Sequence, residues 1–377
     1  MIYRAVGIMS GSSLDGLDIA FVEFQEQGGK WTWQILESSC MEYSSEWAER
    51  LKNACNLNAR EYQLLHTAYG RYIGQETNRF IEQNHLEYKV AVIGSHGHTS
   101  FHMPEQHMTA QLGDGAAIAA FTRLPVVSDL RSLDVALGGQ GAPIVPIGEK
   151  LLLSEYQLFL NIGGIANISF NSPDQYIAYD ICPANRVLNM LAAELGKEYD
   201  EDGALAASGK ADMKLLDKLN ALEYYSRPAP KSLANDFGTD QIYPMITQST
   251  LNIEDSIRTY TEHIVTQIKR SVLGFYGENN QSPGQQLLVT GGGAFNKFLI
   301  QRLNDELATL NIQVVVPDSG LVKFKEAMIM AFIAVLRWRQ EFNVLSSVPV
   351  RPGRALVVLY GRVRKPNFLY LSINFLQ

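Results

Sequence analysis

A short polar segment near the start of the chain has the composition of an anion-binding loop. The sequence VGIMSGSSLDGLDIAFVEF, residues 6–24, places this segment between two apolar runs that predict β-strands. Its two glycines, two hydroxyls and two carboxylates are Gly11, Ser12, Ser13, Asp15, Gly16 and Asp18. Glycines let backbone amides approach a phosphate, whereas carboxylates repel it unless a divalent cation lies between them. The segment indicates a Mg²⁺–nucleotide site; a hairpin turn capped by its own Asp and Ser side chains is the alternative.

Two further glycine-rich turns follow later in the chain. LFLNIGGIANISF, residues 158–170, again sets glycines between two strand-like runs, which suggests a second domain of related topology. LLVTGGGAFNKFL, residues 287–299, reads as a strand, a turn and a helix, which suits the phosphates and ribose of a nucleotide at a helix N-terminus. A tight strand-to-helix turn is the alternative reading of this last segment. The G-x-x-x-x-G-K-[ST] pattern is absent, and G-x-G-x-x-G does not follow the first strand, so neither a P-loop NTPase nor a Rossmann dehydrogenase is expected.

Histidines gather in one polar segment: His96, His98, His102 and His107 fall within twelve residues. A His-x-His pair can bind zinc, but no third ligand stands at the spacing of a structural zinc site. A polar loop, or a loop that contacts a substrate, is therefore the preferred interpretation.

The composition is that of an ordinary globular protein and limits the classes of partner. The chain has 377 residues, 46% apolar and 19% charged, which predicts about two domains. A net charge of −7 argues against nucleic acid or an anionic membrane as partner. The longest apolar run, residues 327–336, is too short to span a bilayer, and no signal peptide is recognisable. The three cysteines suggest no disulfide framework, so a cytoplasmic protein is expected.

Alternating strand and helix patterns predict an α/β fold with ligands at the carboxyl ends of strands. We expect helices over 59–84 and 114–122, and strands within 88–97 and 124–131. In the second half we expect strands at 287–290 and 313–316, and helices near 185–195, 210–222, 254–274, 296–310 and 323–340. We place the domains at 1–135 and 136–377, with the glycine-rich segment 136–143 as a hinge or, equally, a binding loop.

The order of these motifs resembles the anhydro-N-acetylmuramic acid kinase family, within the actin-like ATPase and sugar kinase superfamily. The resemblance is carried by MSGSSLDGLD, SHGHTSFHMP, DLRSLDVALGGQGAPIVP, LNIGGIANIS, DEDGALAASG, PKS and VTGGGAFN, in this order over most of residues 6–340. It implies two actin-like, ribonuclease H-like domains with a cleft between them for ATP and sugar. Residues 349–377 do not align with the family and form an atypical tail.

The activity that this resemblance implies uses ATP and Mg²⁺ to open the 1,6-anhydro ring of anhydro-N-acetylmuramic acid in peptidoglycan recycling. A carboxylate activates water, and O6 receives the γ-phosphoryl group. Asp180 is the candidate base: it ends the expected strand YIAYD, although an Asp that caps the next helix is the alternative. Here the family reads approximately D-T-G-P-G-N and this chain DICPAN, so Ile181, Cys182 and Ala184 replace a hydroxyl residue and two glycines. We interpret Cys182 as a packing residue.

The resemblance also assigns binding roles. The expected ATP-binding residues lie in the three glycine-rich turns and are Gly11, Ser12, Ser13, Leu14, Asp15, Gly16, Leu17, Asp18, Asn161, Gly163, Gly164, Asn167, Gly291, Gly292, Gly293 and Asn296. Asp18 is expected to meet Mg²⁺ through the nucleotide. The expected sugar-binding residues are His96, His98, Arg131, Asp134, Asn185 and Glu326, and many relatives carry Gln in place of His98.

Three alternatives remain open: a kinase for another sugar on the same fold, a degenerate nucleotide-binding homologue, and a glycosidase that works without ATP. The glycosidase would need a second carboxylate at a suitable distance from Asp180, and it leaves the three turns unexplained. A homodimer is compatible with the resemblance.

Overall fold

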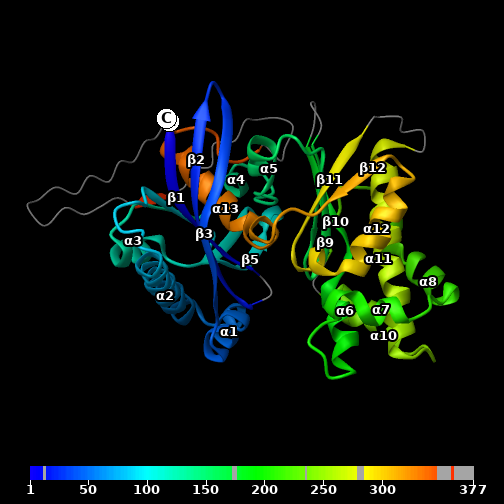
Figure 1. Cartoon of the computed structure of the whole chain (residues 1–377). Helices are drawn as coiled ribbons and strands as arrows, with labels where there is room; N and C mark the ends of the chain where they lie inside the picture. The colour runs from blue at the N-terminus through cyan, green and yellow to red at the C-terminus, as the bar shows by residue number, and fades with distance from the viewer. Residues whose placement is uncertain (12–13, 172–175, 234–235, 278–283, 346–357, 361–377) are drawn as a thin grey trace, which may run out of the picture. The chain divides into compact units, whose positions relative to one another are not determined.

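The computed structural model describes residues 1–11, 14–171, 176–233, 236–277 and 284–345, together with the backbone of 358–360 (Figure 1). The chain divides into two compact units. Unit 1 comprises Met1–Ile147 and the residues from Glu326 onward, and unit 2 is the continuous segment Gly148–Lys325. The boundary predicted after residue 135 therefore differs from this division at both ends, and the segment 136–143 lies wholly in unit 1.

Unit 1 is built on a six-stranded sheet of order β13-β7-β4-β1-β2-β3. Strands β1, β2 and β3 form an antiparallel meander, β4 and β7 run parallel to β1, and β13 pairs antiparallel with β7. The strands are β1 (Ile2–Ser10), β2 (Gly16–Gln27), β3 (Lys30–Glu42), β4 (Val92–Ser95), β7 (Val126–Ser128) and β13 (Val358–Tyr360), with a separate hairpin of β5 (His98–Met103) and β6 (Met108–Leu112). Strand β13 belongs to the predicted atypical tail; the rest of 349–377 lies outside the described residues.

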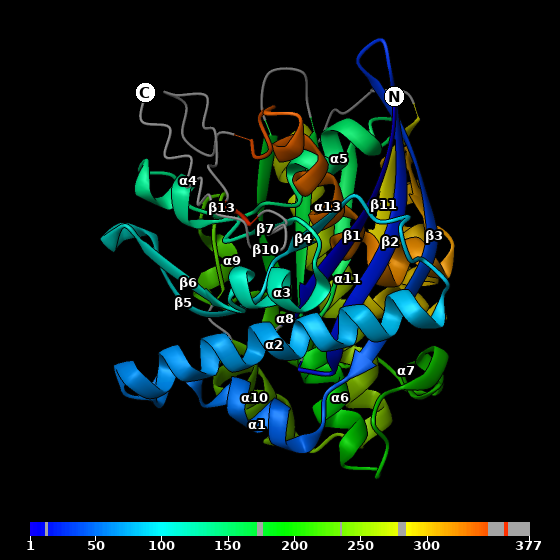
Figure 2. The same cartoon turned by 90° about the vertical axis from the view of Figure 1, so that its left-hand side faces the viewer.

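Helices cover both faces of the first sheet. The helices of this unit are α1 (Ser45–Lys52), α2 (Ala59–Gln83), α3 (Gly115–Thr122), α4 (Ser132–Ala136) and most of α13 (Ser319–Trp338). Figure 2 shows the long helix α2 running across the first sheet. Its Leu65, Tyr69 and Ile73 belong to a core with Val6 and Ile8 of β1. On the opposite face β1 and β4 approach α13 so closely that a Cβ on Gly7 or Gly94 would meet its backbone.

Unit 2 repeats the connectivity of unit 1. Its five-stranded sheet has the order β10-β9-β8-β11-β12, in which β8, β9 and β10 form the meander and β11 and β12 run parallel to β8. The strands are β8 (Leu158–Ile162), β9 (Ile165–Asn171), β10 (Tyr176–Pro183), β11 (Gln285–Thr290) and β12 (Ile312–Val315). The repeated order confirms the related topology that the second glycine-rich hairpin predicted.

One face of the second sheet carries a continuous apolar core. Leu160, Ile168 and Val289 pack there against Val187 of α6 and Ile264 of α11. The helices of this unit are α6 (Asn185–Ala193), α7 (Ala204–Ser208), α8 (Met213–Asn220), α9 (Glu223–Ser226), α10 (Tyr243–Thr247), α11 (Ile253–Tyr276) and α12 (Lys297–Ala308), and α5 (Pro146–Leu152) begins in unit 1. The expected α/β layering is thus confirmed.

Asparagine and aspartate side chains start many of these helices. Asn58, Asn252 and Asn296 accept hydrogen bonds from amides in the first turns of α2, α11 and α12, and Asp114 and Asp212 do so for α3 and α8. Such caps satisfy amides that have no partner within the helix. They explain why most predicted helices begin within a few residues of their observed starts.

A buried ion pair of unit 2 lies close in sequence to both points where the chain passes between the units. Lys325 Nζ is 2.8 Å from Glu149 Oε1, and both side chains are at most 4% exposed. The Tyr176 hydroxyl donates to the other oxygen of Glu149. Breaking a buried pair by removing one partner is costly because a charge is left without compensation.

Candidate active site

The first glycine-rich hairpin lies between β1 and β2 of unit 1. Ser12 and Ser13, two of its predicted phosphate ligands, lie outside the described residues. Asp15 Oδ1 accepts from the Gly16 amide at 3.0 Å, as the hairpin-turn alternative requires. Strand β2 already begins at Gly16, so Gly16, Leu17 and Asp18 belong to the strand. Leu17 is fully buried in the core, so only its backbone is positioned to meet a ligand.

Asp18 lies on the other face of β2, because side chains alternate along a strand. It stands in register with Met9 of β1 and Cys40 of β3. Burial, and next the hydrogen bond to Asp18, raise the pKa of the Cys40 thiol, which is therefore protonated and donates to the carboxylate. One carboxylate is enough for a Mg²⁺ ion that is held mainly by nucleotide phosphates and water. Asp18 fits such an ion.

A chain of hydrogen-bonded hydroxyl groups holds the end of β1, where this hairpin turn begins. Ser10, the last residue of β1, accepts a hydrogen bond from the Tyr43 hydroxyl at 2.8 Å, and its Oγ lies 3.2 Å from His98 Nδ1. The Tyr43 hydroxyl also lies 2.6 Å from that of Tyr69 on α2. Burial lowers the pKa of His98, so its ring is neutral at neutral pH. The structure thus connects His98 to the start of the glycine-rich turn.

His96 and Arg131 form a second polar cluster in unit 1. Arg131 Nε donates to His96 Nε2 at 2.9 Å, and Arg131 Nη1 donates to the carbonyl of Gly141 at 2.7 Å. Burial, together with the Arg131 cation, lowers the pKa of His96 to about 3. The ring is therefore neutral, with its proton on Nδ1, which lies 2.8 Å from the Gly97 carbonyl. Burial also lowers the pKa of Arg131 to about 10, so this side chain keeps its charge.

Asp134 and Glu326 belong to the surroundings of Arg131. Asp134 Oδ2 accepts from the Gly141 amide at 2.7 Å, so the predicted hinge or binding loop 136–143 is held from both sides by Arg131 and Asp134. The negative charge of Glu326 acts on Arg131 and counters the effect of burial on its pKa. The helix that carries Glu326 was expected near 323–340, but α13 begins at Ser319, where Asp318 caps the first amides. Glu326 is therefore an interior helix residue.

In unit 2 the second and third glycine-rich turns come together. The carbonyls of Gly163 and Gly164 accept hydrogen bonds from the amides of Asn185 and Ala184 at the start of α6. The Asn185 side chain donates to the carbonyl of Ile162 at 3.1 Å. A Cβ on Gly292 or Gly293 would come within 3.4 Å of this same side chain. Asn185, predicted as a sugar ligand, therefore connects the two turns predicted to hold the nucleotide.

A row of polar side chains crosses the second sheet on the face opposite its core. Thr290, Asn161, Asn167 and Asp180 are neighbours in register on β11, β8, β9 and β10. Thr290 is 1% exposed, and its hydroxyl has no hydrogen-bond partner within the described residues. The backbone at Gly291 lies close to this row, because a Cβ on Gly291 would collide with the Asn161 side-chain oxygen. The arrangement combines closely approaching backbone with side-chain donors and acceptors, as a nucleotide requires.

Asn296 lies apart from this row. Its side-chain oxygen caps α12 by accepting from the Leu299 amide at 2.9 Å. A Cβ on Gly203, in the motif DEDGALAASG, would collide with the same oxygen. Asn296 has therefore a structural use in addition to the predicted contact with ATP, which stays a prediction.

Asp180 lies at a bulge of β10 and is partly buried. Its Oδ2 accepts from the Leu233 amide at 2.9 Å. Burial raises the pKa of Asp180, and the hydrogen bond from Leu233 opposes this shift. Asp180 does not cap α6, whose N-cap residue is Ala184, so the helix-cap alternative is wrong. A carboxylate held by one amide and raised in pKa suits a general base.

The three replacements in DICPAN lie in the core of unit 2. Ile181, Cys182 and Ala184 are 2%, 0% and 0% exposed and belong to its apolar cluster. Burial raises the pKa of Cys182, which agrees with its interpretation as a packing residue rather than a nucleophile. The altered side chains thus fill the protein interior.

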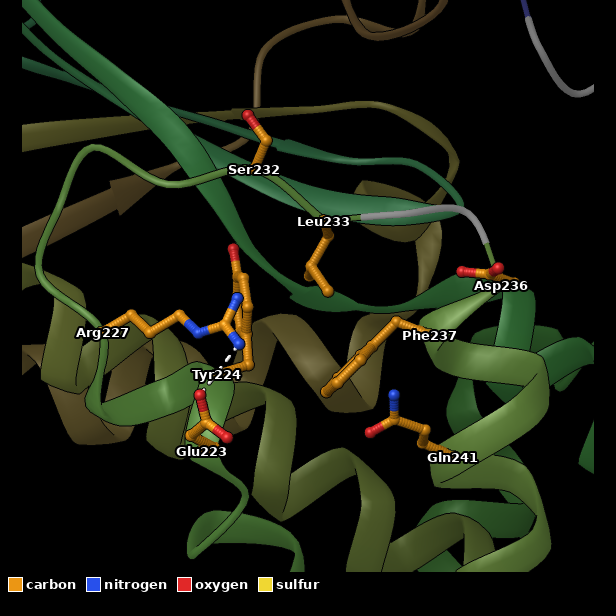
Figure 3. Close-up of a pocket in the computed structure, with 8 residues that line it drawn as sticks. All are labelled: Glu223, Tyr224, Arg227, Ser232, Leu233, Asp236, Phe237 and Gln241. Carbon is orange, nitrogen blue, oxygen red and sulfur yellow. Dashed lines mark hydrogen bonds and ion pairs between the residues drawn. The ribbon is translucent and has the colours of Figure 1, made fainter.

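A pocket of about 330 Å³ opens beside the Asp180 segment (Figure 3). Tyr224, Leu233 and Phe237 form apolar surfaces in it, and Arg227 pairs with Glu223 at 2.9 Å at its edge. Two of these residues contact Asp180 directly: the Leu233 amide donates to its carboxylate, and the Tyr224 hydroxyl donates to its carbonyl at 2.6 Å. No pocket was expected here from the sequence; of the motifs that carry the family resemblance, PKS contributes Ser232 to its lining.

The described residues contain no group of three or more His, Cys, Asp or Glu side chains that would hold a metal ion. No helix in the described ranges has the length and apolarity to cross a membrane.

Two α/β units of equal connectivity, each with a glycine-turned hairpin, and a third glycine-rich turn before a helix are features of nucleotide-dependent phosphotransferases. Comparison with known proteins is more specific. The sequence model described as anhydro-N-acetylmuramic acid kinase matches residues 3–355. The anhydro-N-acetylmuramic acid kinase of Zymomonas mobilis is 33% identical over 376 residues, 95% of this chain and 99% of that protein. The enzyme of the same name from Aliivibrio fischeri is 35% identical and covers 88% and 91% of the two chains.

The chain therefore belongs to the anhydro-N-acetylmuramic acid kinase family, as its motifs predicted, and it is a kinase. Among solved structures, an activator of 2-hydroxyisocaproyl-CoA dehydratase from Clostridium difficile with bound ADPNP matches with a TM-score of 0.44 and 13% identity. This match covers 89% of this chain and 96% of the activator.

Proposed function

We propose that this kinase uses ATP to open the 1,6-anhydro ring of anhydro-N-acetylmuramic acid by hydrolysis and to phosphorylate O6. The products are N-acetylmuramic acid 6-phosphate and ADP, and the reaction belongs to the recycling of peptidoglycan in the cytoplasm. The observation that carries the proposal is the polar row of unit 2, in which Asp180 stands in register with Asn167 beside the glycine-rich turns. Family membership supports the choice of sugar.

The nucleotide would be held by backbone amides and by the polar row. Gly291 and Gly293 let the third turn pack closely against Asn161 and Ile162. The Thr290 hydroxyl, which has no partner among the described residues, offers a further donor. Asp18 and the turn before it would hold Mg²⁺, which neutralises charge on the transferred phosphoryl group. The neutral form of His98 keeps Ser10 in place beneath that turn.

Asp180 would accept a proton from the attacking water. Water adds to the anomeric carbon, the bond from that carbon to O6 breaks, and O6 takes the γ-phosphoryl group while ADP leaves. Burial raises the pKa of Asp180 above that of an exposed aspartate, so its carboxylate is a stronger base than usual. The amide of Leu233 fixes the direction in which the carboxylate points.

In unit 1 the sugar would be bound by Arg131 together with His96, Asp134 and Glu326. Arg131 is suited to the lactyl carboxylate of the substrate, since a guanidinium binds carboxylates with two parallel hydrogen bonds. The bonds to His96 and Gly141 use two of its five N–H donors, one on Nε and one on Nη1. A carboxylate would be met by the second N–H of Nη1 and by Nη2.

A coupled assay tests the proposal. Purified protein, ATP, Mg²⁺ and 1,6-anhydro-N-acetylmuramic acid should release ADP only when the sugar is present, and mass spectrometry should detect the 6-phosphate. ADP release with a different sugar alone would assign another substrate. ATP binding without turnover on any sugar would identify a degenerate homologue, and ring opening without ATP would identify a glycosidase.

A further inference from the structure

Asp180 is held at three points by a segment that lies about fifty residues further along the chain. The Asp180 amide donates to the carbonyl of Lys231 at 3.1 Å. The Tyr224 hydroxyl donates to the Asp180 carbonyl at 2.6 Å, and the Leu233 amide donates to the Asp180 carboxylate at 2.9 Å. Both backbone groups and the side chain of the candidate base are therefore fixed by residues 224–233.

This segment reaches Asp180 because β10 is an edge strand. The sheet has the order β10-β9-β8-β11-β12, so among the described strands only β9 pairs with β10. The register with β9 shifts between Asp180 and Cys182, which loosens the ladder next to the base. Residues 231–233 supply the hydrogen bonds that this exposed edge requires.

Lys231 anchors the segment. Its ammonium donates to the carbonyls of Tyr224, Arg227 and Tyr225 at 3.0, 3.2 and 3.4 Å. It also lies 4.6 Å from the centre of the Tyr224 ring. The Lys231 ammonium thus lies at the carboxyl end of α9, where a positive charge is favoured. The side chain closes residues 224–231 into a loop.

We propose that Lys231 is a positioning residue of the reaction: it holds the loop that presents the Leu233 amide to the Asp180 carboxylate. This inference rests on the role of Asp180 in the proposed function. It gives the motif PKS a purpose that neither the nucleotide turns nor the histidine segment provides. Lys231 acts through the loop, since its ammonium is bound to carbonyls rather than to the carboxylate.

Lys231 could affect Asp180 through the loop or directly through its own charge. The titratable groups near Asp180 help to distinguish these two effects. The charge of Asp180 acts on the Tyr224 phenol, and so do Cys182, Tyr179 and Arg227. Arg227 and Cys182 also act on the Lys231 ammonium. Burial, and next the charge of Asp180, raise the pKa of the Tyr224 phenol, and burial raises that of the Cys182 thiol, so both groups are neutral at neutral pH. Loss of the Leu233 hydrogen bond would raise the pKa of Asp180 further, because that bond favours its ionised form.

The test compares Lys231→Met, which keeps the aliphatic stem, with Lys231→Arg, which keeps the charge and donors. We expect Lys231→Met to lower kcat by roughly 10- to 100-fold, since small displacements of a reacting group have effects of this size. KM for ATP should stay near the wild-type value. The acidic limb of the pH profile of kcat/KM should move to higher pH, and Lys231→Arg should recover part of both effects. Lys197→Met, at an exposed position of the same unit, is the matched control.

Amide hydrogen exchange tests whether Lys231 holds the loop without any measurement of turnover. In Lys231→Met, exchange at residues 231–233 should be faster than in wild type. Wild-type kcat and an unmoved acidic limb in Lys231→Met would overturn the proposal, as would unchanged exchange. If Lys231→Met does not fold, Tyr224→Phe removes one of the three bonds to Asp180 and should lower kcat in the same direction. Full activity of Asp180→Asn would instead refute the proposed base. The exchange result would then still test whether Lys231 holds residues 231–233 in place.

Discussion

The hairpins β1–β2 and β8–β9 occupy equivalent places in two sheets of the same strand order, but their turns are held differently. The first is supported by side chains, through the contacts of Ser10 with Tyr43 and His98. The second is held by backbone hydrogen bonds. The carbonyls of Gly163 and Gly164 accept hydrogen bonds from backbone amides at the start of α6. Carboxylates stand in the first hairpin and are absent from residues 158–171 of the second.

The difference indicates that the two hairpins bind different parts of the ligand. A turn built from backbone carbonyls and amides offers dipoles and close approach, which suit uncharged parts of a nucleotide and the phosphates next to them. A turn flanked by carboxylates suits a phosphate only when a cation accompanies it. We therefore assign metal dependence to the hairpin of unit 1 and base catalysis to the sheet of unit 2, where Asp180 stands opposite Asn167.

The largest effect is expected at Asp180. Asp180→Asn keeps the shape of the side chain but removes its basicity, so turnover should fall by about 10³-fold or more, near the upper range for a general base. Binding of the sugar, measured by calorimetry, should change by only a few-fold. Turnover at the wild-type rate would take Asp180 out of this role.

A substitution in the glycine-rich turns of unit 2 should weaken ATP binding to the same extent with and without Mg²⁺. Gly291 has a φ of 82°, and a Cβ there would collide with Asn161. Gly291→Ala should therefore weaken ATP binding by about 10- to 100-fold, the equivalent of 1–3 kcal/mol of strain, with or without Mg²⁺. Gly274→Ala is the control, because that helical glycine has open space around its Cα. Equal ATP affinity for the two variants would contradict the assignment.

Asp18 provides the opposite test. Asp18→Ala should weaken ATP binding by about tenfold in Mg²⁺, or roughly 1.4 kcal/mol. In EDTA the same substitution should leave affinity unchanged or slightly improved, because the carboxylate then only repels phosphate. Titration calorimetry under both conditions measures the difference. Equal affinity of both proteins in Mg²⁺ would remove Asp18 from the metal site.

The smallest effect is expected beneath the first hairpin. Tyr43→Phe removes the donor to Ser10 and the contact with Tyr69, which should lower the free energy of unfolding of unit 1 by about 1 kcal/mol. Urea denaturation followed by fluorescence gives this value. Tyr88→Phe, at a fully exposed tyrosine, should match wild type. An equal loss in both variants would show that the hydroxyl chain does not support the turn.

Local patterns predicted much of the fold. Helix α2 was expected over 59–84 and spans Ala59–Gln83, because an Asn cap and an apolar stripe define it within a short stretch of sequence. Strand β3 was missed: it lies at an edge of the sheet, so most of its residues are half-exposed and the apolar alternation is weak. Helix α13 was expected to begin near 323, but the Asp318 cap moves its start to Ser319.

The site was predictable only where residues close in sequence share it. The glycine-rich turns and Asp180 could be recognised from motifs. The contact of Arg131 with His96 spans 35 residues, and that of Leu233 with Asp180 spans 53. Such pairs depend on how strands and loops pack, and no spacing in the sequence reveals them. The same holds for the Tyr43 hydroxyl, which reaches Ser10 from a segment beyond β3.

The approach of Gly7 and Gly94 to α13 has a consequence for the order of synthesis. Helix α13 is made after all of unit 2, yet its residues Ala327 and Met330 complete the packing of the first strands of the chain. Unit 2 is continuous and is able to close its core as soon as it leaves the ribosome, whereas the first 147 residues must wait for their last helix. At about 5–20 residues per second this interval lasts on the order of ten seconds or more. During that time one face of the first sheet is a hydrophobic surface open to chaperones.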